Sequence, residues 1–140
     1  VKMIGDEVMF TVATPAAGAE IALALAEGTR EADQLSDVRV GIDHGTVLER
    51  EGDLYGPVVN TASRITNIAF PGSIVVSEAM RDHLFDHQEY VLRAMRARYL
   101  KDIGRVPLWV LRRAQGAESR FADRRRKLGR ATKARVAPKR

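Results

Sequence analysis

The sequence predicts an α/β sandwich, an α+β arrangement with one mainly antiparallel sheet and helices packed on one face of it. Two observations lead to this fold class. Short stretches of strand-forming residues alternate with stretches of helical periodicity, and the connections mix tight hairpin turns with crossovers long enough to hold a helix. The 140 residues, 45% of them hydrophobic, can build the core of one domain and exclude a wholly disordered chain.

The chain begins with a predicted hairpin and a helix. Strand formers fill residues 7–13, and residues 1–4 precede a tight turn at Gly5-Asp6, as the partner strand of a hairpin would. Thr14 followed by Pro15 predicts a helix start, because the hydroxyl caps free N–H groups and proline fits the first helical position. This alanine-rich helix runs to about residue 32. Because the first strand starts at residue 1, we expect a fragment that lacks its N-terminal neighbours.

The middle of the chain predicts two strands and an amphipathic helix. Residues 38–42 alternate apolar and polar positions, which is typical of a half-buried strand, and a turn at His44-Gly45 leads to a second strand over 46–50. Residues 51–53 are expected to form a loop. Over residues 58–69 apolar residues recur every three or four positions, which predicts a helix with one apolar stripe. The stripe consists of Val58, Ala62, Ile65 and Ala69.

The last predicted elements are a short strand, a short helix and two closing strands. Residues 73–76 predict the short strand, and Ser77 can cap the helix that follows. Residues 90–100 and 107–111 predict the closing strands, with residues 101–106 as their connection.

Composition excludes several functional classes. The absence of cysteine excludes a disulfide scaffold, thiol catalysis and cysteine-ligated metal sites, and three scattered histidines leave little for a histidine-rich metal site. The longest near-continuous apolar run, residues 21–26, is far shorter than the ~20 residues of a membrane-spanning helix. We therefore expect a cytoplasmic protein, or one on the cytoplasmic side of a membrane if membrane helices precede this chain.

Charge divides the chain into two parts. Residues 1–111 carry 11 basic and 16 acidic residues, a net of −5, whereas residues 112–140 carry 12 basic and 2 acidic residues, a net of +10. An acidic body is a poor surface for nucleic acid, so no specific nucleic-acid partner is expected. We expect residues 114–140 to form a basic, flexible, solvated tail. The alternatives for this tail are a contact with anionic lipid, with nucleic acid or with the acidic body.

Polar residues that suit chemistry occur at the first turn and on the second helix. Lys2 and Asp6 flank the turn, where a carboxylate held between two strands suits Mg²⁺, although Gly-Asp is also an ordinary turn sequence. Asn60 and Arg64 are four residues apart and lie on one side of a helix. Such a pair suits a phosphate or an oxyanion, but it also occurs on ordinary solvated helices.

Two further residues become candidate site residues only because of the residues expected near them. Asp53 lies just before that helix, and Lys101 lies in the connection between the closing strands. A residue of either kind in a loop is normally just solvated. Lys101 becomes a candidate if Lys2 and Arg64 lie nearby.

The order and spacing of these stretches resemble the catalytic domain of the class III nucleotide cyclases, the adenylate and guanylate cyclase homology domain. The similarity covers about residues 1–113, with the matching text in residues 2–10, 38–47, 52–65 and 71–77. Its most specific part is the string Gly-Asp-x-x-Gly-x-x-Val-Asn-x-Ala-Ser-Arg. The resemblance implies a ferredoxin-like cyclase fold whose N-terminal strand and helices are missing from this chain.

The resemblance also implies a role for each candidate residue. Asp6 falls on the second of the family's two metal-binding aspartates, and Asn60 on the asparagine that orients the ribose. Arg64 falls on the arginine that stabilises charge on the α-phosphate. Lys101 resembles the lysine that holds the terminal phosphates.

The base-selecting positions of the family correspond to Lys2 and Asp53, and this pair favours ATP over GTP. The implied reaction converts ATP to 3′,5′-cyclic AMP and pyrophosphate by in-line attack, with two Mg²⁺ or Mn²⁺ ions per site. In this family each site forms between two subunits, which implies a head-to-tail homodimer. The family's first metal aspartate has no counterpart in this chain, so we expect the chain alone to be inactive and a complete protein to be active.

Two other functions fit parts of the sequence. The first is a catalytically silent cyclase-like domain that dimerises or regulates, although such a domain need not keep all the candidate residues. The second is a nucleic-acid-binding protein led by the basic tail, but that tail lacks the interleaved aromatic residues that single-strand binding normally uses.

Overall fold

The computed structural model describes residues 1–4 and 6–115, and in this part of the chain it contains three helices and ten strands. The helices are α1 (Pro15–Glu31), α2 (Pro57–Ile68) and α3 (Glu78–Leu84). The strands are β1 (Lys2–Ile4), β2 (Glu7–Met9), β3 (Val40–Ile42), β4 (Leu48–Arg50), β5 (Asp53–Tyr55), β6 (Ile74–Ser77), β7 (Tyr90–Ala94), β8 (Arg98–Leu100), β9 (Gly104–Val106) and β10 (Leu108–Arg113). No helix among these residues is long and apolar enough to cross a membrane.

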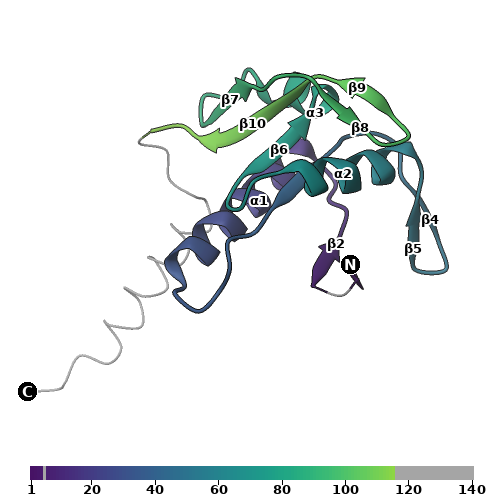
Figure 1. Ribbon diagram of the computed structural model, residues 1–140, viewed down its shortest axis with the longest axis horizontal. Helices are drawn as coiled ribbons and strands as arrows, with labels where there is room; N and C mark the ends of the chain where they lie inside the picture. The colour runs from purple at the N-terminus through teal and green to yellow at the C-terminus, as the bar shows by residue number, and fades with distance from the viewer. Residues whose placement is uncertain (5, 116–140) are drawn as a thin grey trace, which may run out of the picture.

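Four strands form the central sheet, in the order β3-β6-β10-β7 (Figure 1). β3 runs parallel to β6, whereas β10 is antiparallel to both β6 and β7, so the expected mainly antiparallel sheet is confirmed. A parallel pair needs a crossover, and the segment that contains α2 provides it. The other six strands form the hairpins β1–β2, β4–β5 and β8–β9. In Figure 1 the first two hairpins project from the same side of the body.

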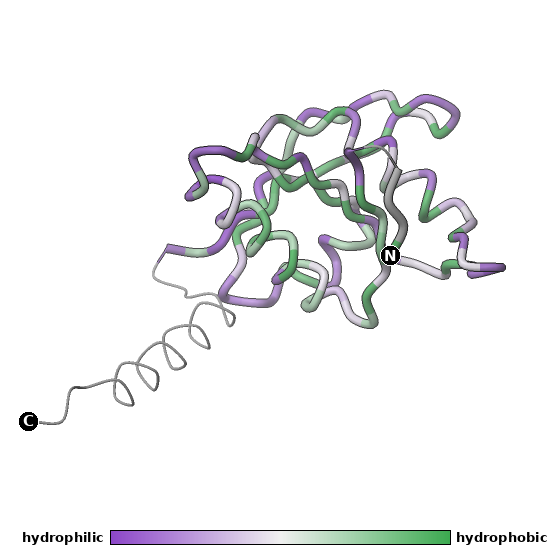
Figure 2. Tube along the Cα trace, turned by 90° about the horizontal axis from the view of Figure 1, so that it is seen from below, coloured by the Kyte–Doolittle hydropathy of each residue, from purple (hydrophilic) through white to green (hydrophobic). Residues whose placement is uncertain are grey.

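Helices cover both faces of the central sheet, which corrects the expectation that they cover one face. α1 and α3 share a core with Ile74 and Val76 of β6, whereas Ile65 of α2 shares a core with Val75. Successive strand residues point to opposite faces, so these two cores lie on opposite sides of β6. Every residue of β6 is buried, as expected for a strand that is covered on both faces. Figure 2 shows the apolar segments gathered in the interior and hydrophilic segments at the outer turns.

Side-chain caps start the helices α1 and α3 where the sequence predicts them. The Thr14 hydroxyl accepts a hydrogen bond from the backbone N–H of Ala17 at 3.2 Å, and Pro15 occupies the first turn. The Ser77 hydroxyl accepts from the backbone N–H of Met80 at 3.3 Å. Both predicted starts are therefore confirmed.

Several strands differ from the expected ones in length. β2 ends at Met9, so residues 10–13 lie outside the ladder with β1. The strand expected over residues 90–100 consists of β7 and β8, and the expected connection over 101–106 contains β9. This interruption lets the chain leave the central sheet and place Leu100 in the core of α2.

Arg113, the last residue of β10, is anchored to α1. Its guanidinium donates to Glu27 at 2.8 Å and to both carboxylate oxygens of Glu20 at 3.1 and 3.3 Å. Burial lowers the pKa of Arg113, but the hydrogen bonds and charges of Glu20 and Glu27 outweigh it and raise that pKa above its usual value. Arg113 therefore belongs to the folded body and not to a solvated basic run. Residues 116–140, and with them nearly all of the expected tail, lie outside the described residues.

Candidate functional site

The outer side of α2 carries Asn60 and Arg64. The core side of α2 is fixed by Ile65 and, at the C-cap, by Ala69. They are 0% and 4% exposed, so these two members of the expected apolar stripe are confirmed as core residues. Asn60 is exposed, and the Arg64 side chain is 36% exposed. Because the two residues are four apart, the helix presents both on one side.

Gly41 of β3 sets how closely α2 lies on the sheet. A Cβ at this position would lie 2.5 Å from the backbone nitrogen of Thr66 and 2.6 Å from the carbonyl oxygen of Ala62. The helix backbone therefore rests directly on the strand backbone, and only glycine leaves room for it. In the sequence Gly41 is merely one position of an alternating strand, so nothing local reveals this contact. It determines where Asn60 and Arg64 are held.

The turn between β8 and β9 brings Lys101 to the side of α2 that carries Arg64. The Arg64 Nη2 atom lies 3.4 Å from Oδ2 of Asp102, the residue after Lys101, and the two form an ion pair. Lys101 itself is exposed. Arg64 thus lies beside the turn that carries Lys101. Lys2, the other residue on which the candidacy of Lys101 depends, lies on the β1–β2 hairpin, so the role of Lys101 stays a prediction. Asp102 was not a candidate from the sequence, because no local pattern connects it with a residue 38 positions earlier.

Asp53 is the first residue of β5 and not, as expected, part of a loop. It is half-buried, and the Tyr55 hydroxyl donates to its Oδ2 atom at 3.4 Å. Arg50 of β4 lies opposite it in the ladder. β5 contacts α2, so Asp53 is held on a hairpin that packs beside the helix with Asn60.

The β1–β2 hairpin carries the remaining two candidates. Lys2 lies opposite Met9 in the ladder, and the exposed residue Asp6 lies in the turn, whereas Gly5 falls outside the described residues. In the described part of the chain no hydrogen bond or ion pair joins Asp6 to Asn60 or Arg64. The structure thus places Asp6 on a different hairpin from the groups around α2.

Asp6 can supply one ligand to a divalent metal ion. Mg²⁺ that is bound with a nucleotide takes one or two protein carboxylates and otherwise phosphate oxygens and water, which an exposed carboxylate at a turn can satisfy. Among residues 1–4 and 6–115 no group of three or more His, Cys, Asp and Glu side chains is placed to hold a metal. Within this part of the chain, Asp6 therefore does not belong to a larger cluster of metal-ligating side chains.

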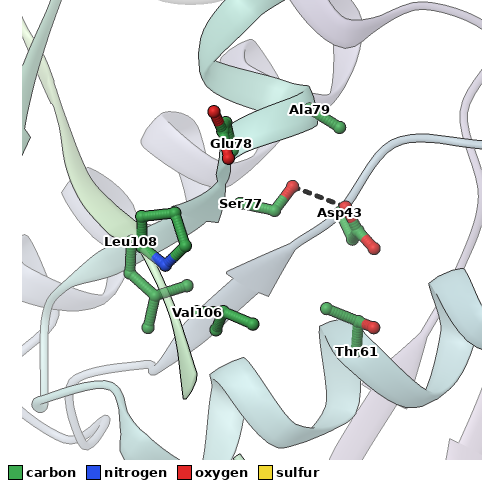
Figure 3. A pocket seen from close by; sticks show the side chains of 8 residues that line it. Asp43, Thr61, Ser77, Glu78, Ala79, Val106 and Leu108 are labelled. Carbon is green, nitrogen blue, oxygen red and sulfur yellow. Dashed lines mark hydrogen bonds between the residues drawn. The ribbon is translucent and has the colours of Figure 1, made fainter. Parts of the chain in front are cut away.

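A cavity of about 160 Å³ lies where β3 and β6 end (Figure 3). The Ser77 hydroxyl donates to the Asp43 carboxylate on one wall, and Thr61 of α2 lies across from them. The cavity is smaller than the roughly 300–1,000 Å³ of typical small-molecule sites, and none of the six candidate residues lines it. It is separate from the groups around Arg64.

Residues 1–113 match the sequence profile of the adenylate and guanylate cyclase catalytic domain. The chain belongs to this family. The chain is 35% identical over 117 residues to an adenylate cyclase of Glutamicibacter nicotianae, a match that covers 84% of this chain and 29% of that protein. It is 43% identical over 89 residues to an adenylate cyclase of Streptomyces griseus, which covers 64% of this chain and 22% of that protein. The chain thus spans less than a third of the length of either relative.

A solved structure confirms the cyclase fold. The crystal structure of an adenylate/guanylate cyclase/hydrolase from Silicibacter pomeroyi superposes with a TM-score of 0.62 at 28% identity. The match covers 76% of this chain and 66% of that one. The class III cyclase domain expected from the sequence is therefore confirmed.

Proposed function

We propose that this cyclase domain acts as an adenylate cyclase, which converts ATP to 3′,5′-cyclic AMP and pyrophosphate at sites shared by two copies in a head-to-tail homodimer. One observation carries the proposal: Arg64 and Asn60 lie on the outer side of α2, with the turn of Lys101 against Arg64. These are groups suited to a triphosphate, whereas the candidate metal ligand Asp6 lies on another hairpin. The names of the two bacterial relatives support ATP as the substrate.

In the proposed reaction the ribose 3′-oxygen forms a bond to the α-phosphorus as the hydroxyl loses its proton. The bond from the α-phosphorus to the bridging oxygen breaks, and pyrophosphate leaves. Arg64 donates forked hydrogen bonds to the α-phosphate as charge builds on it. Asn60 orients the ribose, and Lys101 holds the terminal phosphates. Divalent ions, when bound, lower the pKa of the attacking hydroxyl and offset phosphate charge, with Asp6 of the other copy as one ligand.

Complementation between two inactive variants tests the shared site. We expect Asp6→Ala and Arg64→Ala to be inactive when each forms a homodimer of the full-length protein. A mixed dimer of the two variants contains one site in which both residues are intact, so it should form cyclic AMP at about half the rate of the wild-type dimer. Co-expression with two different affinity tags, tandem purification and a cyclic AMP assay with Mn-ATP measure this rate.

A dimer of two differently tagged Arg64→Ala copies is the control and should remain inactive. A mixed dimer that stays inactive contradicts a shared site, provided that it folds and dimerises like the wild type. If the wild-type protein binds ATP but forms no cyclic AMP, the catalytically silent regulatory domain is the better reading.

The choice of purine tests the roles of Lys2 and Asp53. Lys2→Glu combined with Asp53→Cys should lower the ratio of ATP use to GTP use by roughly tenfold or more, because polar groups would face the wrong purine without partners. The measurement is kcat/KM for each nucleotide with the full-length protein. Glu49→Cys, an exposed position of the same β4–β5 hairpin, is the control and should leave the ratio unchanged. An unchanged ratio in the double variant removes the base-selecting roles.

A further inference from the structure

Arg64 is already paired in the structure, and its partner is an acidic residue from a distant turn. The Arg64 Nη2 atom and the Asp102 Oδ2 atom are 3.4 Å apart, across 38 residues of sequence. The Arg64 side chain is 36% exposed and the Asp102 side chain is 75% exposed. Exposed pairs of this kind are weak, so an incoming phosphate can displace the carboxylate.

The turn that carries Asp102 does not require an acidic residue. The backbone N–H of Ile103 donates to the carbonyl of Leu100 at 3.1 Å, which closes a four-residue turn with Asp102 at its third position. Asp102 has a φ of +64°, a conformation that this position of a turn prefers to fill with glycine or asparagine. The acidic group is therefore not explained by the turn itself, and asparagine can replace it without strain in the backbone.

The position of Asp102 gives it an effect on the phosphate site. Its carboxylate occupies the side of Arg64 that faces the turn, and it follows directly after Lys101. In this structure Arg64 is paired with the carboxylate that directly follows Lys101 in the chain. A phosphate that takes the same donor atom of Arg64 competes with this carboxylate.

We propose that Asp102 is a positioning residue, which holds Arg64 toward the β8–β9 turn in the empty site and gives way to a nucleotide phosphate. This inference rests on the proposed function. In this role the Asp102 carboxylate competes with the nucleotide phosphates for Arg64, which lowers the affinity for the triphosphate. Arg64 leaves Asp102 only when a nucleotide binds.

Binding of 3′-deoxy-ATP to the full-length protein tests the exchange, because this analogue lacks the attacking hydroxyl and stays intact. Asp102→Asn should lower its dissociation constant roughly two- to fivefold, as measured by calorimetry with Mn²⁺. In an Arg64→Ala background Asp102→Asn should change the dissociation constant of 3′-deoxy-ATP less than about 1.5-fold, because the Asp102 carboxylate then has no guanidinium to pair with. An equal effect in both backgrounds overturns the proposal, since it would show only a general loss of negative charge.

Asp82→Asn is the matched control. Asp82 forms another exposed pair, with Arg81 at 3.2 Å, on the helix α3, which carries none of the candidate residues. The substitution removes the same charge as Asp102→Asn does. It should leave the dissociation constant unchanged.

The NMR signal of the Arg64 side-chain Nε–Hε group tests the contact without nucleotide. Asp102→Asn should shift this signal and increase its motion on the picosecond to nanosecond timescale, whereas Asp82→Asn should not. An unchanged signal overturns the inference even in an active cyclase. A wild-type protein that binds 3′-deoxy-ATP but makes no cyclic AMP overturns only the proposed function, and one that binds no nucleotide overturns both.

Discussion

Arg64→Ala is expected to lower kcat for cyclic AMP formation about a hundredfold or more, because the α-phosphate loses a donor aimed at its developing charge. The fold should tolerate the change. Arg64 lies on the outer side of α2, alanine is the best helix former, and the lost pair with Asp102 is exposed and worth about 0–1 kcal/mol. The measurement is cyclic AMP formed from saturating Mn-ATP by the full-length protein, with thermal unfolding followed by circular dichroism.

Arg64→Lys and Arg93→Ala serve as comparisons for this prediction. Lysine keeps the charge but not the forked donors, so its rate should lie between those of wild type and alanine. Arg93 is an exposed arginine on β7, and its loss should leave kcat unchanged. If Arg64→Ala retains more than about a tenth of the wild-type kcat, the arginine does not stabilise the transition state in the proposed way.

Gly41→Ala is expected to be the most damaging small substitution in the fold. The new methyl group would lie 2.5 Å from a backbone nitrogen of α2, and backbone cannot move aside by changing a rotamer. Overpacking of this kind costs about 1–3 kcal/mol of unfolding free energy, which corresponds to a melting temperature lower by roughly 5 °C or more. Because α2 carries Asn60 and Arg64, a displacement of ~1 Å should also lower kcat about a hundredfold.

Gly28→Ala is the control, because the same methyl group would meet nothing within 4 Å on the exposed side of α1. It should raise the unfolding free energy by about 0.5–1 kcal/mol, since alanine is less flexible in the unfolded chain. Thermal unfolding and the cyclic AMP assay measure both variants. A Gly41→Ala protein as stable and as active as wild type would show that α2 does not rest on β3 as the structure places it.

The helices could be predicted from the sequence because their signals are local. Thr14 and Ser77 satisfy N–H groups only three residues later, and the apolar stripe of α2 repeats within a single helix. The pairing of Asn60 with Arg64 on one side of α2 is local for the same reason. Caps and stripes act over one or two turns, so tertiary contacts rarely override them.

Strand lengths and sheet order could not be predicted in the same way. β10 pairs with β6 and β7 at once, and each pairing depends on residues far away in the sequence. Residues 10–13 have strand-forming side chains but no place in the ladder with β1, so β2 ends at Met9. The composition of a strand shows that it can pair, whereas the rest of the fold decides how far it does.

The sequence by itself determined the fold class, the helices and the motif that identifies the cyclase domain, because these depend on residue types and on spacing along a short stretch. Tertiary structure decided that helices cover both faces of the sheet, that α2 packs directly on Gly41 and that Arg64 forms an ion pair with Asp102. Each of these depends on atoms brought together from distant parts of the chain. Such contacts arise from packing in three dimensions, and no short-range pattern encodes them.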